Sequence, residues 1–188
     1  MTNTVMAYEP QNFEQAQEMC KVLAESTFVP AVYRGKPGDV FAACSLGKSL
    51  GLSSVASLQN IAVINGRPSI YGDALLALVM SSGEVEKVEE EFDEATFTQT
   101  YKIWRKGING EFVGTYSWND AQAAGLTGKE PWKKYPKQML WRRAVAIALK
   151  KGFADKLLGA EMREVMEDVT PHEEPKQVKS MSERALED

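Results

Sequence analysis

The sequence has few of the residues that metal sites and nucleophilic catalysis require. It contains one histidine, His172, and two cysteines, Cys20 and Cys44, which lie far apart in the chain. These residues do not have the spacing of a zinc site, so we expect no metal and expect both cysteines to be reduced, buried side chains. The Gly-x-x-x-x-Gly-Lys-Ser/Thr loop and the Gly-x-Ser-x-Gly motif are also absent. The sequence therefore favours a binding protein without a cofactor over an ATPase or a serine hydrolase.

Long apolar runs are missing as well. No stretch approaches the roughly 20 apolar residues that a membrane span needs, and no secretory signal is visible at the N-terminus. We therefore expect a cytoplasmic protein. The length of 188 residues, with 44% hydrophobic and 26% charged residues, is typical of one globular domain.

What the chain does have is a concentration of positive charge. Between Lys129 and Lys151 there are eight basic residues and one acid, Glu130, so this stretch carries +7 in a chain of net charge −4. Three aromatic residues lie among the cations: Trp132, Tyr135 and Trp141. Cations neutralise phosphates, and flat rings stack on unpaired bases. The stretch therefore predicts a nucleic-acid site, and the alternative is an ordinary helix with a solvated basic face.

Apolar residues at spacings of three and four predict the helices. They cover residues 11–26, 39–50, 74–80 and about 135–151, with short helical turns over 53–58 and 153–158. Asp39 and Asp73 are expected to be N-caps, and Ser117 or Asn119 is expected to cap a short helix that ends at Gly125. Pro136 suits the first turn of the long helix. A loop is expected around Gly128 and Pro131.

Two groups of strands are predicted. Segments 60–64 and 67–71 flank Asn65-Gly66, a strong hairpin signal. Segments 84–92, 96–106 and 112–118 are expected to form an antiparallel meander with a turn at Asn109-Gly110. The predicted fold class is α+β, with an antiparallel three-stranded sheet and a β-hairpin packed against helices. A core domain is expected over 1–160 and a disordered tail over 161–188, where nine acids and four bases give −5.

Further candidate binding residues lie outside the basic helix face. On strand 96–106, Lys102, Trp104 and Lys106 share one face and form a possible platform for bases; the alternative turns Trp104 into the core and pairs the lysines with the acidic strand. Arg67 follows a tight turn and presents its cation either to a groove or simply to solvent. The acids Glu86, Glu89, Glu90 and Glu91 are the best candidates for a metal site, although a solvated strand is favoured.

Several segments, taken in order, resemble the RecT branch of the RecT/Redβ-type phage single-strand annealing proteins. The resemblance covers about residues 35–160. The segments are GLS (51–53), SLQNIAVINGRP (57–68), GDAL (72–75), SGEV (82–85), WNDAQAAGL (118–126), PWKKYPKQML (131–140), RRA (142–144) and GFAD (152–155). The specificity lies in their order and spacing together rather than in any single motif.

This resemblance implies ATP-independent binding of single-stranded DNA and annealing of complementary strands in recombination. It also implies a Rad52-like annealing core and a homo-oligomer, as a ring or a helical filament, that acts in a bacterial host cell. A phage exonuclease and the host single-strand-binding protein are possible partners, although the acidic tail is all that remains of the region that contacts them in longer relatives. By position, the family's basic motif corresponds to Lys133, Lys134, Lys137, Arg142 and Arg143, and Arg67 corresponds to the residue after its hairpin turn. The roles of Lys102, Trp104 and Lys106 come from the strand pattern alone. Two alternatives to the annealing function stay open: a metal-dependent DNA nuclease that uses acidic residues of 84–94, and a non-catalytic oligomeric phage protein whose basic helix contacts acidic proteins.

Overall fold

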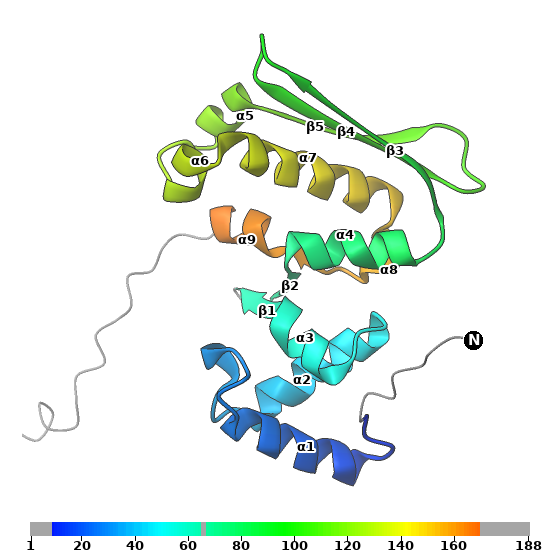
Figure 1. The fold of residues 1–188 in the computed structure, drawn as a ribbon, viewed down its shortest axis with the longest axis vertical. Coiled ribbons are helices and arrows are strands. Elements are labelled where there is room, and N and C mark those ends of the chain that lie inside the picture. The colour runs from blue at the N-terminus through cyan, green and yellow to red at the C-terminus, as the bar shows by residue number, and fades with distance from the viewer. Residues whose placement is uncertain (1–8, 65–66, 170–188) are drawn as a thin grey trace, which may run out of the picture.

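The long helix α7 (Pro136–Gly152) lies between the larger sheet and a group of shorter helices (Figure 1). Pro136 occupies its first position, as predicted, where a missing N–H breaks no helical hydrogen bond. The middle of the helix is buried through Ala144, Val145, Ala148 and Leu149. The computed structural model describes residues 9–64 and 67–169.

One side of α7 covers an antiparallel sheet made of β3 (Val85–Asp93), β4 (Thr98–Arg105) and β5 (Glu111–Ser117). This confirms the predicted meander. Tyr101 and Ile103 are buried beneath α7, on the face that the alternation predicted. At Gly114 a Cβ atom would lie 1.9 Å from the carbonyl oxygen of Ala144. Glycine therefore permits the backbone of α7 to approach β5 directly.

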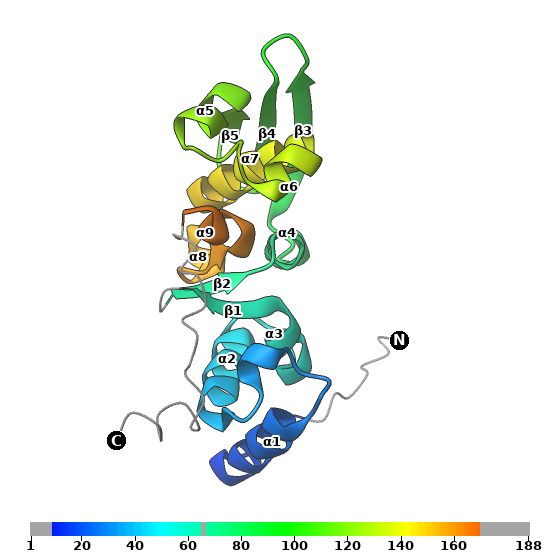
Figure 2. The ribbon, with the colours of Figure 1, turned by 90° about the vertical axis from the view of Figure 1, so that its left-hand side faces the viewer.

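The opposite side of α7 faces α4 (Gly72–Ser81), α8 (Ala154–Leu157) and α9 (Arg163–Val169), and below these lies a second, smaller sheet (Figures 1 and 2). Its strands β1 (Ile61–Ile64) and β2 (Arg67–Ile70) are antiparallel, as expected of a hairpin. The expected turn at Asn65-Gly66 lies outside the described residues. A third strand, β6 (Glu161–Met162), pairs with β2 in parallel through two residue pairs.

The N-terminal helices form a separate layer at the far end of the molecule from the large sheet (Figure 2). It contains α1 (Phe13–Glu25), the short 3₁₀ helix η1 (Ala31–Tyr33), α2 (Pro37–Ser49) and α3 (Ser54–Asn60). Cys20 and Cys44 are free and buried in its core, as predicted, and burial raises the pKa of Cys44 to about 11. The Tyr33 hydroxyl donates a hydrogen bond of 2.7 Å to the carbonyl of Ile61, which ties this layer to the small sheet.

Several predicted helix ends are corrected by the structure. Ser117 caps α5 (Trp118–Ala123) through a capping box with Asp120, as predicted. Asp39 and Asp73 instead lie within the first turns of α2 and α4. There a carboxylate stabilises the helix through its favourable interaction with the helix dipole, although it is not the N-cap. The expected loop near Pro131 contains a five-residue helix, α6 (Glu130–Lys134).

The folded chain continues past residue 160, where the sequence analysis placed the start of the tail. Residues 161–169 form β6 and α9, and Met162 is buried in the main core. Residues 170–188, including His172, lie outside the described residues. In the part of the chain that the structure describes, no single helix is both long and apolar enough to cross a membrane; α2 and α3 reach that length only as a pair bent by 105°.

Candidate nucleic-acid interface

Arg142 lies on the side of α7 that faces α9, at the edge of the buried core. Its guanidinium, with 15% of the side chain exposed, forms an ion pair with the carboxylate of Glu164. The same carboxylate accepts a hydrogen bond of 3.0 Å from the backbone N–H of Gly72, the first residue of α4. Arg142 is therefore held by packing, as predicted, but its charge is already matched by an acid from α9.

Arg143 is matched in the same way. Its Nη2 lies 3.0 Å from a carboxylate oxygen of Asp168, whose side chain is only 7% exposed. Asp168 also accepts hydrogen bonds from the indole N–H of Trp132 at 3.0 and 3.1 Å, and its backbone carbonyl accepts one from Lys129. The Arg143 guanidinium lies 5.5 Å from the ring centre of Tyr116, and burial raises the pKa of that phenol. The Nε atom of Arg143 is buried and has no hydrogen-bond partner among the described residues.

The three rings of the basic stretch have different environments. Trp132 is fully buried beside Tyr116 and Trp118. Trp141 is half-buried and packs edge-on against Tyr101. Only Tyr135, between α6 and α7, is well exposed, at 60%. Of these rings, Tyr135 is the one available for stacking on a base, whereas the two tryptophans build the core.

Lys133, Lys134 and Lys137 surround Tyr135 at the corner between α6 and α7, and all are more than half exposed. Lys134 lies 3.2 Å and Lys133 4.0 Å from the single carboxylate of Glu130. Lys137 pairs with Glu94 at 2.5 Å and lies 4.5 Å from the ring centre of Phe92. We call Lys133, Lys134, Tyr135 and Lys137 the lysine corner. Exposed pairs of this kind contribute little stability, so these lysines can exchange their acids for phosphates at small cost.

Within the sequence of this stretch the cations are nearly unopposed, with one acid for eight bases, but the folded structure supplies further acceptors. Every one of the eight has a polar partner. Beyond those above, Lys150 pairs with Glu161 at 2.6 Å, and Lys151 donates to the carbonyl of Val113 at 2.9 Å. Most of the partners come from distant parts of the sequence, so local counting could not detect them.

The predicted platform on β4 lies on the face of the sheet opposite α7. Lys102 is half-buried and lies directly opposite Glu89 on the neighbouring strand β3. Trp104 is half-buried on this outer face, and Lys87 lies 4.9 Å from its ring centre, so it is not turned into the core. The pKa of Glu89 is lowered, mainly by a hydrogen bond from Lys87 and further by the charge of Lys102. Lysines and glutamates thus alternate here, and the face is less positive than the lysine corner.

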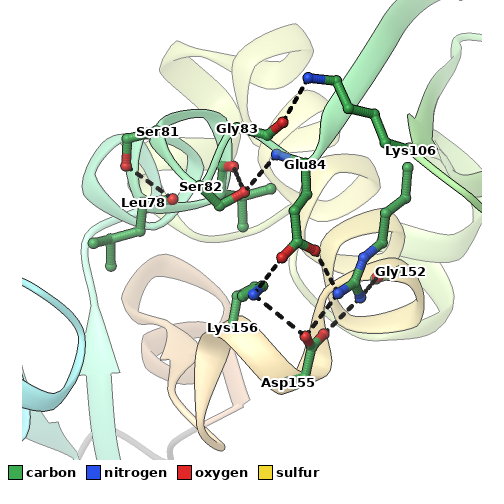
Figure 3. A network of polar contacts seen from close by, with 11 residues as sticks. Leu78, Ser81, Ser82, Gly83, Glu84, Lys106, Gly152, Asp155 and Lys156 are labelled. Carbon is green, nitrogen blue, oxygen red and sulfur yellow. Dashed lines mark hydrogen bonds and ion pairs between the residues drawn. The ribbon is translucent and has the colours of Figure 1, made fainter.

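Lys106 lies in the turn just after β4, outside the strand in which it was predicted, and donates a hydrogen bond of 2.7 Å to the carbonyl of Gly83 (Figure 3). It borders a cluster in which Arg105 bridges Glu84 at 2.5 Å and Asp155 at 2.6 Å, with Lys156 beside both acids (Figure 3). The hydrogen bonds to Asp155 raise the pKa of Arg105, and those from Lys156 and Arg105 lower the pKa values of Glu84 and Asp155 respectively. This cluster joins Glu84, just before β3, to the end of β4 and to α8, and it has a structural role.

Arg67 is exposed at the start of β2, opposite Ile64. In the described residues, no ion pair is formed by Arg67. It belongs to the small sheet, whereas the lysine corner lies beside the large one (Figure 1).

The structure thus brings two groups of predicted residues together: the lysine corner, and Arg142 with Arg143 on the next turns of the same helix. It does not bring Lys102, Trp104 or Lys106 to either group. The sequence analysis counted Lys129 in the basic stretch but did not identify Gly72 or the two acids of α9 as neighbours of the arginines. A signal for α9 was present, because Met162, Val165 and Met166 have helical spacing and Glu164 and Asp168 are four residues apart.

The acidic strand does not gather into a metal site. Among residues 9–64 and 67–169, no group of three or more histidine, cysteine, aspartate or glutamate side chains is placed to hold a metal ion. Successive residues of a strand point to opposite faces, which separates Glu89 and Glu91 from Glu90.

Comparison with protein-family models and with curated proteins gave no match for this chain. The resemblance to the annealing proteins therefore rests on the order of its motifs.

Proposed function

We propose that this protein binds single-stranded DNA and anneals complementary strands without ATP, as a homo-oligomer. The observation that carries the proposal is the lysine corner, where three exposed cations share two carboxylates beside one exposed ring. Cations contact the phosphates of any sequence, and a ring stacks on any base, so such a surface suits binding without sequence preference.

The mechanism follows from these two kinds of contact, cations with phosphates and a ring with bases. The first strand is held by its phosphates, so its bases remain free to pair with a second strand. Selection belongs to base pairing rather than to the protein, and stacking provides roughly 1.4 kcal/mol per base-pair step as the duplex grows. The annealed intermediate is expected to bind more tightly than either strand alone.

The order of the elements supports the same proposal. A β1–β2 pair, α4, an antiparallel three-stranded sheet and the long helix α7 follow one another along the chain. This is the hairpin-sheet-helix order that the resemblance implies, and the Rad52-like core is part of the proposal.

The N-terminal layer supports self-association. Four large apolar side chains are at least half exposed in this region: Phe13, Val22, Phe28 and Val32. Phe13 also lines a cavity of about 290 Å³ between α1 and α2, together with Cys20 and Phe41. Exposed apolar groups of this kind are typical of contacts between proteins, and we assign them to a second copy of the chain.

The direct test is an annealing assay in two steps. The protein is mixed with one labelled oligonucleotide, and then its complement or a scrambled strand is added, with EDTA and without nucleotide. We expect faster duplex formation with the complement and a more stable complex than with the scrambled strand. Binding without faster annealing would indicate a single-strand-binding protein. No binding at low salt would contradict the proposal and indicate that the basic helix contacts acidic proteins.

The same samples test a nuclease, the alternative that the acidic strand suggested. Labelled DNA is incubated with magnesium and with EDTA. Magnesium-dependent degradation would contradict a purely binding role, whereas intact DNA in both samples is the expected result.

A further inference from the structure

Helix α9 brings two carboxylates to the two arginines of α7. Glu164 and Asp168 are four residues apart and therefore lie on one face of α9, on successive turns. Arg142 pairs with Glu164, and Arg143 pairs with Asp168 at 3.0 Å. The two arginines that best suit a two-pronged grip on phosphate are thus both occupied by acids from the same short segment.

The surroundings of the two carboxylates are those of an anion site. Glu164 accepts hydrogen bonds from Arg142 and from the N–H of Gly72 at the N-terminus of α4, where helix dipoles favour negative charge. Asp168 accepts from Arg143 and from the indole N–H of Trp132, and Lys129 lies 4.0 Å away. The buried Nε of Arg143 has no hydrogen-bond partner among the described residues, so the carboxylate leaves unused a donor that a phosphate, with more oxygens, can reach.

The short helix that supplies these acids has few buried apolar contacts of its own. Helix α9 has seven residues, too few to be stable alone, and β6 before it forms two residue pairs with β2. Met162 of β6 is buried in the main core and Arg163 contacts the ring of Tyr71, so the start of the segment is anchored. Within α9, Val165 packs against the main core but remains partly exposed. The ion pairs are therefore a large part of what holds α9 in place, and a competing polyanion acts on those same pairs.

From these contacts we infer that α9 is an autoinhibitory segment whose Glu164 and Asp168 occupy a phosphate-binding site formed by Arg142, Arg143, Lys129 and the Gly72 amide. The DNA backbone reaches this site only when α9 moves away. The lysine corner, which α9 does not cover with ion pairs, makes the first contact. This inference rests on the proposed function, because it takes single-stranded DNA as the competitor.

The first experiment compares two double variants of the full chain. Glu164→Gln with Asp168→Asn removes the two charges that face the arginines. The control, Glu161→Gln with Glu167→Gln, removes two charges from the same segment that pair with Lys150 and Arg163 instead. The probe is a fluorescent thymidine oligonucleotide, and the affinity is measured by anisotropy over a range of salt concentrations.

We expect the first variant to bind about tenfold more tightly than wild type, as for a site that is open about a tenth of the time before the change. The affinity of the control variant is expected to stay within about twofold of wild type, and its salt dependence is expected to match that of wild type. Equal gains in the two variants would overturn the inference, because they would reflect net charge alone. If neither wild type nor the first variant binds at low salt, the proposed function itself fails.

A second measurement uses wild-type protein and so does not depend on how the variants fold. Hydrogen exchange is followed at the amides of residues 163–169 with and without saturating oligonucleotide. The inference expects these amides to exchange at least several-fold faster in the DNA complex, while those of α7 are unchanged or slower. DNA binding with equal or greater protection of α9 would overturn the inference and leave the proposed function intact.

Discussion

The lysine corner and the arginine pair come from one short stretch of sequence but differ in what surrounds them. At the corner, each lysine is more than half exposed and pairs with an exposed acid. One to two turns further along α7, Arg142 and Arg143 are 15% and 12% exposed and pair with acids that are nearly buried. The difference teaches that the density of charge in a sequence does not measure the charge available to a ligand. Availability depends on how easily each cation can leave its present partner.

The largest expected effect comes from removing the lysine corner. Changing Lys133, Lys134 and Lys137 to Ala removes three exposed cations. Each contact with a single strand contributes about 0.7 to the slope of log affinity against log salt, so the slope falls by about 2 and the affinity at roughly 0.1 M salt falls about a hundredfold. Anisotropy titrations over a salt series measure both.

The matched control removes Lys21, Lys36 and Lys48, which are exposed at the opposite end of the molecule. It lowers the net charge equally and is expected to change the salt slope by less than about 0.5. An equal loss in both triple variants would show that binding follows net charge and that the corner is no site.

A smaller effect is expected from the ring at the corner. Tyr135→Ala removes an exposed stacking surface, which is typically worth about 1–3 kcal/mol per base. We expect binding to weaken about tenfold with little change in salt slope, since no cation is lost. Tyr135→Phe keeps the ring and should bind like wild type; weak binding by both variants would mean that the hydroxyl, not stacking, matters.

The next effect concerns stability at the arginine pair. Asp168→Ala leaves Arg143 and the Trp132 indole without their acceptor, while the backbone carbonyl that Lys129 binds remains. A trapped, unpaired buried charge costs about 3–5 kcal/mol, but release of α9 returns the arginines to water, so we expect a loss of about 1–2 kcal/mol. Denaturant unfolding measures it, with Glu94→Ala at the corner as a control that should change stability by less than about 0.5 kcal/mol. Equal losses of stability in the two variants would contradict the view that the arginine pair is held by stabilising contacts and the lysine corner is not.

The smallest effect is a pH-dependent loss of stability, expected when the Arg105 cluster is disrupted. The pKa values of Glu84 and Asp155 are lowered from 4.5 and 3.8 by Lys156 and Arg105. A lowered pKa in the folded state contributes stability above the ordinary value, and this contribution is lost as the pH falls through the lowered pKa. Arg105→Gln should therefore unfold at a lower temperature than wild type at neutral pH, and the gap should narrow below about pH 4. A gap that stays constant with pH would contradict this role.

Features with local signals were predictable from the sequence. The meander, its buried face, the long helix after Pro136 and the Ser117 cap each depend on residues within a few positions of one another. The outer placement of Trp104 was left open, because alternation defines two faces without saying which one is covered when both carry a ring.

The environment of the basic residues was not predictable in the same way. Arg142 and Arg143 meet acids 22 and 25 residues later, in a segment whose acidity suggested disorder. Trp132 looked like a stacking ring beside lysines, yet its indole N–H is held by Asp168, which fixes the ring in the core. Such outcomes depend on tertiary contacts, which composition and periodicity do not contain.

The short parallel pairing of β2 with β6 has a consequence for how the molecule assembles. Ser69 meets Glu161, so this contact closes a loop of about ninety residues that contains the whole large sheet and α7. Closing so long a loop is slow and is rewarded by few hydrogen bonds, so it is expected to be among the last steps of folding. In this expected order of steps, the sheet and α7 form before α9 docks. The two arginines would then stay uncovered until α9 docks, and this face of the chain would be more basic before that step than after it.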